Sequence, residues 1–247
     1  IIATPASTHY EIAKHCIQLG LPCIVEKPIA TELSKVQEIY ELAKKNKAII
    51  LVNHIHLYHP AFNEIKKIAK EIKNIFSINA IAGRYGPFRK DIRALWDWGP
   101  HDIAMSIEIM GNRPKVIEAS YLSQSNQIFS KGEIIQTKLL FDNEKIATLI
   151  FGNLMKNKIR KFDIKTEESI FRYQPLLDKK LLKLSFSDKF PKSETEIITS
   201  DISALENLLI KFRDLIQKKE ENLNDVKLAL IVTSVIESIE NLLDKNN

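Results

Sequence analysis

The sequence predicts an α/β protein in which a parallel sheet with crossover helices is followed by an open, mixed or mostly antiparallel sheet flanked by helices. Residues 1–52 alternate short apolar segments with helical periods over connections of a few residues, as parallel sheets do. Residues 116–199 read mostly as short strands. Two amphipathic helical segments end the chain, and we expect helices to flank the second sheet.

In the first segment, the spacing of apolar residues gives the type of each element. Continuous apolar runs are typical of strands covered on both faces, and Gly20 ends the first helical period. Thr8 and Glu11 have the spacing of a capping box, which indicates a helix start close to them. We expect a strand at 1–3, a helix at about 9–19, a strand at 21–25, a helix at about 32–45 and a strand at 48–52.

The rhythm changes after residue 52. Pro100 suits the first turn of a helix that ends before Gly111, and Asp142-Asn143 lies between two alternating segments as a hairpin turn does. We expect helices at about 60–72, 100–110, 202–216 and 228–242, and strands at about 75–83, 116–123, 133–141, 146–151, 161–166, 169–172, 181–186 and 196–198.

Composition and charge exclude several classes of protein. The 247 residues include 36 Lys and Arg against 31 Asp and Glu, a formal net charge of +5. The basic residues alternate with acids along predicted helices, which argues against a nucleic-acid partner. No apolar run reaches the roughly 18 residues of a membrane span. Two cysteines make no disulfide framework, so a reducing, cytoplasmic environment is expected.

The first candidate for chemistry is Glu26-Lys27-Pro28, which ends an apolar strand in polar residues. Ligands of open α/β sheets bind at the carboxyl ends of the strands. Desolvation there lowers the pKa of a lysine and suits it to proton transfer or to polarising an oxygen. The alternative is that Lys27 is a solvated residue at the end of a strand.

The second candidate is the segment from Asp97 to Asp102, in which Asp97 and His101 are four residues apart. If the turn is helical, both side chains face the same space. A carboxylate beside an imidazole fixes its tautomer and raises its basicity, as acid–base catalysis at neutral pH requires. The alternative is that Asp97 caps the helix and His101 is a core histidine.

The third candidate is the polar segment after the strand at 48–52. If the strand continues, His54 and His56 face one way, and His59 lies near them. A metal site is conceivable, but no cysteine or acidic ligand is close in the sequence. We favour a polar rim around a cleft, with no bound metal. No set of glycines in the chain makes G-x-G-x-x-G.

Taken in order, these motifs resemble the Gfo/Idh/MocA family (glucose-fructose oxidoreductase, inositol dehydrogenase). The resemblance begins at Ile2-Ala3-Thr4-Pro5 and His9, continues through Glu26-Lys27-Pro28, Asn53 and Asp97-x-x-x-His101-Asp102, and extends to the closing helices. It implies that residues 1–53 are the remainder of a Rossmann dinucleotide-binding domain. Residues 54–247 would then form an α+β domain for substrate binding and oligomerisation, whose last helices pack back on the first domain.

The resemblance also implies an oxidoreductase that uses NAD or NADP on a sugar, cyclitol or sugar nucleotide. Lys27 would contact the substrate oxygen and the nicotinamide ribose, His101 would be the general base, and Asp97 would orient the substrate and His101. The residues expected to line the nicotinamide half of the cofactor are Thr4, Pro5, His9, Glu26, Lys27 and Asn53. The residues expected to border the substrate are Arg84, Trp96 and Trp98.

The sequence departs from the family pattern at its start. The chain begins with Ile1 inside a strand-like segment, and the family's glycine-rich loop would precede it. We therefore expect an N-terminally truncated family member that binds NAD(P) poorly as written, because the lost helix N-terminus would hold the pyrophosphate. Neither the substrate nor the choice between NAD and NADP follows from these residues.

The same motifs are compatible with two other functions. One is a family member without catalysis that binds a sugar or cofactor as a sensor or scaffold. Another is an NAD-dependent glycoside hydrolase or dehydratase that works through transient oxidation. The segment Arg93–His101 resembles relatives from surface-polysaccharide sugar pathways, and a homo-oligomer formed through the second sheet is expected.

Overall fold

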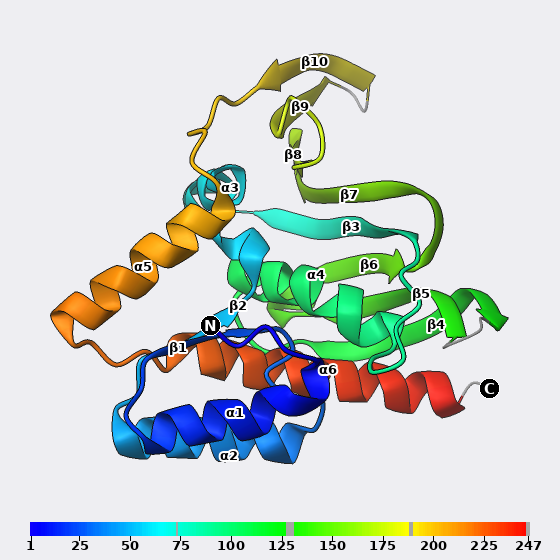
Figure 1. Cartoon of the computed structure of the whole chain (residues 1–247). Helices are drawn as coiled ribbons and strands as arrows, with labels where there is room; N and C mark the ends of the chain where they lie inside the picture. Colours follow the sequence, from blue (N-terminus) through cyan, green and yellow to red (C-terminus); the bar gives the residue numbers. More distant parts are fainter. Residues whose placement is uncertain (73, 127–130, 188–189, 246–247) are drawn as a thin grey trace.

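A computed structural model describes the whole chain except residues 73, 127–130, 188–189 and 246–247. It has a small parallel sheet near the N-terminus and a large mixed sheet, which confirms the predicted fold class. Helix α6 (Asn224–Lys245) lies between the two and contacts β2, α2, α4 and β4 (Figure 1).

The small sheet brings two polar strand ends side by side. Strands β1 (Cys23–Glu26) and β2 (Ile50–Asn53) pair in parallel, with Glu26 opposite Asn53. Ile2 adds a single parallel bridge to Val25 on the other side of β1. The crossover helices are α1 (Ala6–Gln18) and α2 (Leu33–Asn46). Because the strands run the same way, their carboxyl ends form one edge at which a ligand site can be built.

The large sheet has the strand order β10-β9-β8-β7-β3-β6-β5-β4. Only β3 and β6 pair in parallel, and the other neighbours are antiparallel. The strands are β3 (Ile75–Tyr85), β4 (Lys115–Asn126), β5 (Lys131–Leu140), β6 (Ile146–Gly152), β7 (Leu154–Thr166), β8 (Ser169–Tyr173), β9 (Leu181–Ser187) and β10 (Phe190–Glu196). The turn between β5 and β6 is the short η2 (Asp142–Glu144), at the predicted hairpin.

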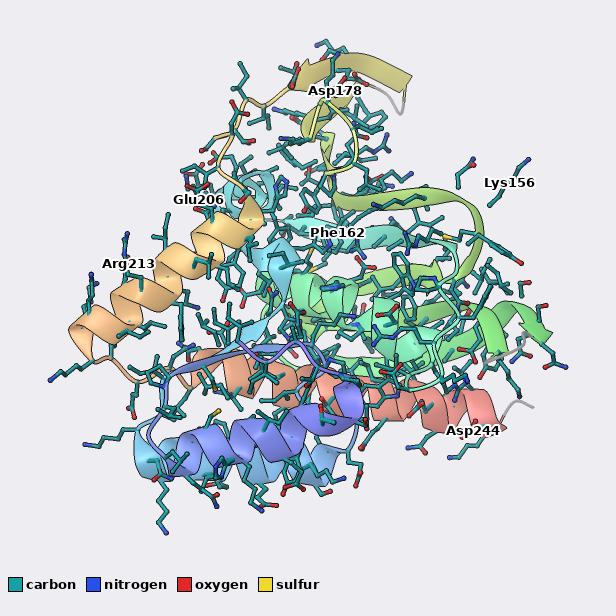
Figure 2. All side chains as sticks on the ribbon, viewed as in Figure 1. Lys156, Phe162, Asp178, Glu206, Arg213 and Asp244 are labelled. Carbon is teal, nitrogen blue, oxygen red and sulfur yellow. The ribbon has the colours of Figure 1, made fainter. Side chains whose placement is uncertain are left out.

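Helices pack on one face of this sheet and enclose the main core. The helices are α3 (Pro60–Glu71), α4 (Ala94–Met110) and α6, while α5 (Ala204–Lys218) lies apart, over η1. Phe62 from α3 packs edge-on against Phe162 from β7, and both are fully buried. Figure 2 shows Phe162 inside the molecule, whereas Lys156 at the start of the same strand points away from it.

Helix α4 begins earlier than predicted, and Pro100 lies in its interior. The prediction placed Pro100 at the first turn, where its missing N–H costs nothing. The helix instead starts at Ala94, and Leu95 is fully buried in the main core. We infer that burial of the first turn outweighs the loss of one backbone hydrogen bond at Pro100. Asp97 and His101 therefore belong to one continuous helix.

The histidine segment does not extend the strand as expected. The chain leaves β2 at Asn53 and forms the 3₁₀ turn η1 (Ile55–Tyr58). His54 turns into the interior with 2% of its surface exposed, while His56 remains partly exposed. The shared face expected for His54 and His56 is thus wrong, because it required strand geometry. The last predicted strand, 196–198, is also displaced, since β10 ends at Glu196.

The closing helix of the chain returns to the first segment. The closing helix α6 packs against α2 of the first segment, and Leu33 donates its backbone N–H to Glu237 of α6 at 2.8 Å.

Cys16 and Cys23 are free, and burial raises the pKa of the Cys23 thiol to about 12. Within the described residues, no helix has both the length and the apolar character to cross a membrane.

Candidate active site

A pocket of about 270 Å³ lies where the carboxyl end of β1 meets η1, α4 and β7. It brings together the three predicted catalytic residues, which come from two separate segments of the chain. The pocket is lined by Lys27, His56, Asp97, Trp98, His101, Lys158, Ile159, Arg160 and Leu176.

Lys27 is held inside the pocket by Asp97. Its ammonium donates to the backbone carbonyl of Asp97 and to the carboxylate Oδ1 at 3.0 Å. Only 12% of the Lys27 side chain is exposed. Burial lowers the pKa of Lys27, and the negative charge of Asp97 opposes that effect. The result is a desolvated ammonium anchored on one side, so Lys27 is not the solvated residue of the alternative reading.

The carboxylate of Asp97 serves Lys27 and not His101. Within the described residues, it makes no hydrogen bond to His101, and its second charged neighbour is Arg89 at 3.9 Å. The expectation that Asp97 orients His101 is therefore wrong in this structure. The reason is electrostatic, because an ammonium within reach binds a carboxylate more strongly than a neutral imidazole does. Asp97 also does not cap α4, whose N-cap is Arg93.

His101 is set up as a neutral imidazole. Its Nδ1 is buried with no hydrogen-bond partner in the described part of the chain. Burial, followed by the positive charge of Lys27, holds the pKa of His101 well below its usual range. Because Nδ1 is closed off, Nε2 is the nitrogen through which the ring can act. A neutral imidazole in a pocket is suited to accept a proton.

A buried ion pair lies directly behind His101. Asp102 Oδ1 accepts from Arg160 at 2.8 Å, and the exposed fractions of the two side chains are 1% and 5%. The second oxygen of Asp102 has no partner among the described residues. Burial raises the pKa of Asp102, and Arg160 opposes the rise. The pair fixes β7 against α4 beside the pocket, with a large cost if either charge is removed.

The residues predicted to line the cofactor gather at the edge of the small sheet. Asn53 donates to Glu26 at 2.7 Å, and both lie at strand ends beside Lys27. Asn53 Oδ1 is buried and has no partner in the described residues. Pro5 is the N-cap of α1, and the Thr4 hydroxyl bonds to Thr8 at 2.7 Å on the surface.

His9 clamps two of these loops together. Its ring nitrogens lie 2.8 Å from the carbonyl oxygens of Pro28 and Thr4, and the side chain is 2% exposed. Both partners are backbone carbonyl oxygens, which act as acceptors. The contacts place His9 beneath the edge as a residue that ties the loop at Thr4 to the exit of β1.

The residues predicted to border the substrate separate into one that lines the pocket and two that do not. Trp98 lines it, and its Nε1 is buried without a partner in the described chain. Trp96 points the other way and donates to Glu240 of α6 at 3.0 Å. Arg84 is exposed on β3 and bonds to the carbonyl of Gly86. Trp96 and Arg84 do not line this pocket, because neighbouring residues on a helix face different directions and Arg84 lies on the exposed side of β3.

Sequence reasoning missed Arg160 and placed His56 only at a rim. The two-residue period of strand β7 could have identified Arg160. Phe162 and Ile164 are buried, and Arg160 lies on the same face of the strand. His56 carried no such signal, because η1 is set by contacts with other parts of the chain. Within the described residues, no three His, Cys, Asp or Glu side chains gather as metal ligands would.

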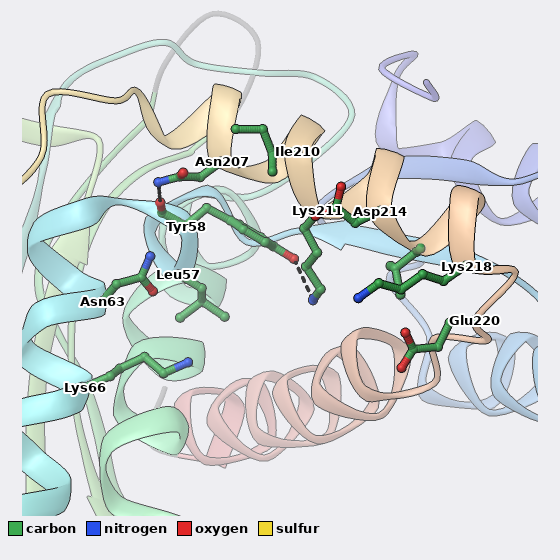
Figure 3. A pocket seen from close by; sticks show the side chains of 11 residues that line it. Leu57, Tyr58, Asn63, Lys66, Asn207, Ile210, Lys211, Asp214, Lys218 and Glu220 are labelled. Carbon is green, nitrogen blue, oxygen red and sulfur yellow. Dashed lines mark hydrogen bonds between the residues drawn. The ribbon is translucent and has the colours of Figure 1, made fainter.

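A larger cavity of about 520 Å³ lies elsewhere, between η1, α3 and α5 (Figure 3). Lys66, Lys211 and Lys218 reach it, but Lys211 pairs with Asp225 at 2.9 Å and Lys66 with Glu108. Two of the three cations are thus neutralised. The smaller pocket is the candidate active site because it combines a desolvated lysine with a neutral histidine.

Comparison with known proteins agrees with the resemblance. Residues 1–54 match the family model of Gfo/Idh/MocA, described as an oxidoreductase family with an NAD-binding Rossmann fold. A UDP-N-acetylglucosamine 3-dehydrogenase of Acidithiobacillus ferrooxidans is 22% identical over 163 residues, which are 66% of this chain and 51% of that protein. An NADP-dependent scyllo-inositol 2-dehydrogenase of Bacillus subtilis is 24% identical over 164 residues, 62% of this chain and 44% of that protein. The chain spans about half the length of these curated relatives.

Solved structures extend the likeness to almost the whole chain. A crystal structure from Magnetospirillum magnetotacticum has a TM-score of 0.86 at 26% identity and covers 96% of this chain and 78% of its own. A 3-ketoreductase of Actinomadura kijaniata in complex with NADP has a TM-score of 0.82 at 15% identity, over 98% of this chain and 76% of its own. The latter identity is low, so that likeness concerns the fold. The matching N-terminal segment and this fold over the rest support a Gfo/Idh/MocA oxidoreductase.

Proposed function

We propose that the protein transfers a hydride between nicotinamide and a hydroxyl-bearing carbon of a sugar, cyclitol or sugar nucleotide. The observation that carries the proposal is the pocket at the end of β1, where a desolvated Lys27 and a neutral His101 lie together. The family description and the names of the dehydrogenases from A. ferrooxidans and B. subtilis support the reaction class and an NAD or NADP cofactor.

The residues at the sheet edge fit the nicotinamide end of such a cofactor. Asn53 Oδ1 is a buried acceptor without a partner in the described chain, and it suits a donor such as a carboxamide or a ribose hydroxyl. We assign the nicotinamide half to this edge, with Thr4, Pro5, His9, Glu26 and Asn53 around it. When bound, the cofactor supplies C4 of the nicotinamide as the atom that takes or gives the hydride.

In this proposal, Lys27 and His101 act on the oxygen of the reacting carbon. The Lys27 ammonium donates a hydrogen bond to that oxygen and stabilises negative charge that develops there. His101 accepts the hydroxyl proton through Nε2 during oxidation and returns it during reduction. Asp97 keeps Lys27 charged and fixed in place, since it bonds to the ammonium at 3.0 Å.

Within this class, we favour a sugar nucleotide. Lys158 lines the pocket, is exposed, and forms no ion pair with a described residue, so it is free to meet a diphosphate. Trp98 lines the same pocket and offers an indole N–H. A role in surface-polysaccharide sugar metabolism, in the cytoplasm and as a homo-oligomer through the large sheet, is the setting we propose.

The direct test is a substrate screen with the full-length protein. We expect reduction of NAD or NADP with UDP-N-acetylglucosamine, and a lower KM for it than for free N-acetylglucosamine or scyllo-inositol. Cofactor binding without turnover on any of these would support a sensor or scaffold. Formation of product without net reduced cofactor would support hydrolysis or dehydration through transient oxidation.

A further inference from the structure

We propose that His56 is a second substrate-contacting histidine and that the hydroxyl of Tyr173 locks it in the Nε2–H tautomer. The inference rests on the proposed function of the pocket, which it deepens by naming a feature of the substrate. That feature is a free hydroxyl beside the reacting carbon, which accepts a hydrogen bond from His56 while His101 takes the proton of the reacting hydroxyl.

The two histidines lie next to each other in the pocket, although they come from different elements. His56 in η1 meets His101 in α4 edge-on, with their ring centroids 5.1 Å apart. Both line the pocket with Lys27. Behind His56, Tyr173 of β8 is fully buried, and its hydroxyl lies 2.9 Å from Nδ1 of His56. Tyr173 of the large sheet thus holds His56, which lines the pocket at the end of the small sheet.

The direction of this hydrogen bond follows from the surroundings of Tyr173. Burial raises the pKa of the Tyr173 hydroxyl and holds the pKa of His56 well below its usual range, so both groups are neutral. If Nδ1–H donated to the hydroxyl, the buried O–H of Tyr173 would have no acceptor among the described residues, and an unused buried donor is costly. If the hydroxyl donates to Nδ1, both groups are satisfied. The proton of His56 then resides on Nε2.

The two rings therefore play opposite parts toward a substrate. His101 presents Nε2 to the pocket, because its Nδ1 is buried, and the proposed function gives this nitrogen the part of the acceptor. His56 presents a donor, because Tyr173 occupies its Nδ1. A pair made of one donor and one acceptor matches two neighbouring hydroxyls of a sugar ring. Tyr173 acts through His56 and is a positioning residue.

The test combines the tautomer with kinetics. In protein labelled with ¹⁵N at histidine, long-range proton–nitrogen NMR spectra should show His56 as the Nε2–H tautomer, with its signals identified by their loss in His56→Gln. Tyr173→Phe should abolish this preference. In the full-length protein, both variants should raise KM by roughly three- to tenfold with kcat largely retained, as expected for one neutral hydrogen bond. The increase should vanish for a substrate that lacks the neighbouring hydroxyl.

A matched control is His15→Gln, because His15 is exposed on α1 and does not line the pocket. An Nδ1–H tautomer in the unaltered protein would overturn the lock by Tyr173. An unchanged KM in His56→Gln would overturn the substrate contact. Absence of turnover in the unaltered protein would refute the oxidoreductase function instead, and the NMR spectrum would still decide the contact between Tyr173 and His56.

Discussion

Replacing His101 by alanine is expected to lower kcat for sugar oxidation by about 10² to 10⁴, the contribution of a positioned general base. The imidazole is the acceptor that we place on the reacting hydroxyl, and alanine removes both of its nitrogens. The measurement is the initial rate of nicotinamide reduction with saturating substrate. His15→Ala on the surface of α1 serves as the matched control and should keep the full rate.

The pH profile adds a second readout for His101. Because its pKa is held well below the usual range, the neutral, proton-accepting form exists at neutral pH and persists into mildly acidic solution. The oxidation rate should fall only as the pH drops through this lowered pKa. A rate that falls around the ordinary pKa of histidine, or a His101→Ala variant as fast as the unaltered protein, would contradict the assignment.

Replacing Arg160 by methionine is expected to destabilise the fold by about 3 to 5 kcal/mol, because the Asp102 carboxylate is left buried without its partner. Denaturant unfolding at neutral pH measures this difference. Arg213→Met is the matched control, since Arg213 lies on the surface of α5 (Figure 2) and, among the described residues, pairs with its exposed neighbour Asp214. Its effect should stay within about 0.5 kcal/mol.

The loss should depend on pH with a defined sign. Burial raises the folded-state pKa of Asp102, so the folded protein binds the proton more tightly than the unfolded chain does. Without Arg160 that pKa rises further, and the Arg160→Met variant should regain stability as the pH falls toward the unfolded pKa of the carboxyl. Adding Asp102→Asn should recover part of the loss at neutral pH. Equal stability of Arg160→Met and the unaltered protein would show that the pair contributes nothing.

The sequence predicts the small sheet well because its signals are local. The apolar runs that form β1 and β2 each end in polar residues, and the parallel register then sets Glu26 beside Asn53 without further information. Lys27 could be singled out for the same reason, since it follows β1 directly. Helix α4 was placed too late because Pro100 has a local preference for a first turn, which tertiary burial of Leu95 overrides.

The contacts that complete the pocket join distant parts of the chain, which local patterns do not specify. Lys27 and Asp97 are 70 residues apart in the sequence. The four-residue spacing of Asp97 and His101 therefore gives no indication that Asp97 pairs with Lys27. His56 and Tyr173 are 117 residues apart. The orientation of the His56 ring depends on Tyr173 of β8, which contacts it from a distant part of the sequence. Residues on one face of a single helix or strand could be predicted from their spacing in the sequence. Residues that meet in the pocket from different elements could be identified only from the three-dimensional structure.

If the pocket around Lys27 carries out the hydride transfer, removing the Lys27 ammonium must slow the reaction. The rate of NAD or NADP reduction by UDP-N-acetylglucosamine is measured for the unaltered full-length protein, for Lys27→Met and for Lys156→Met, a matched change on the exposed start of β7 (Figure 2). We expect Lys27→Met to lower kcat by about 10² to 10³, as loss of a donor to a developing oxyanion does, and Lys156→Met to leave it unchanged. Equal rates for Lys27→Met and Lys156→Met would contradict this role of the pocket.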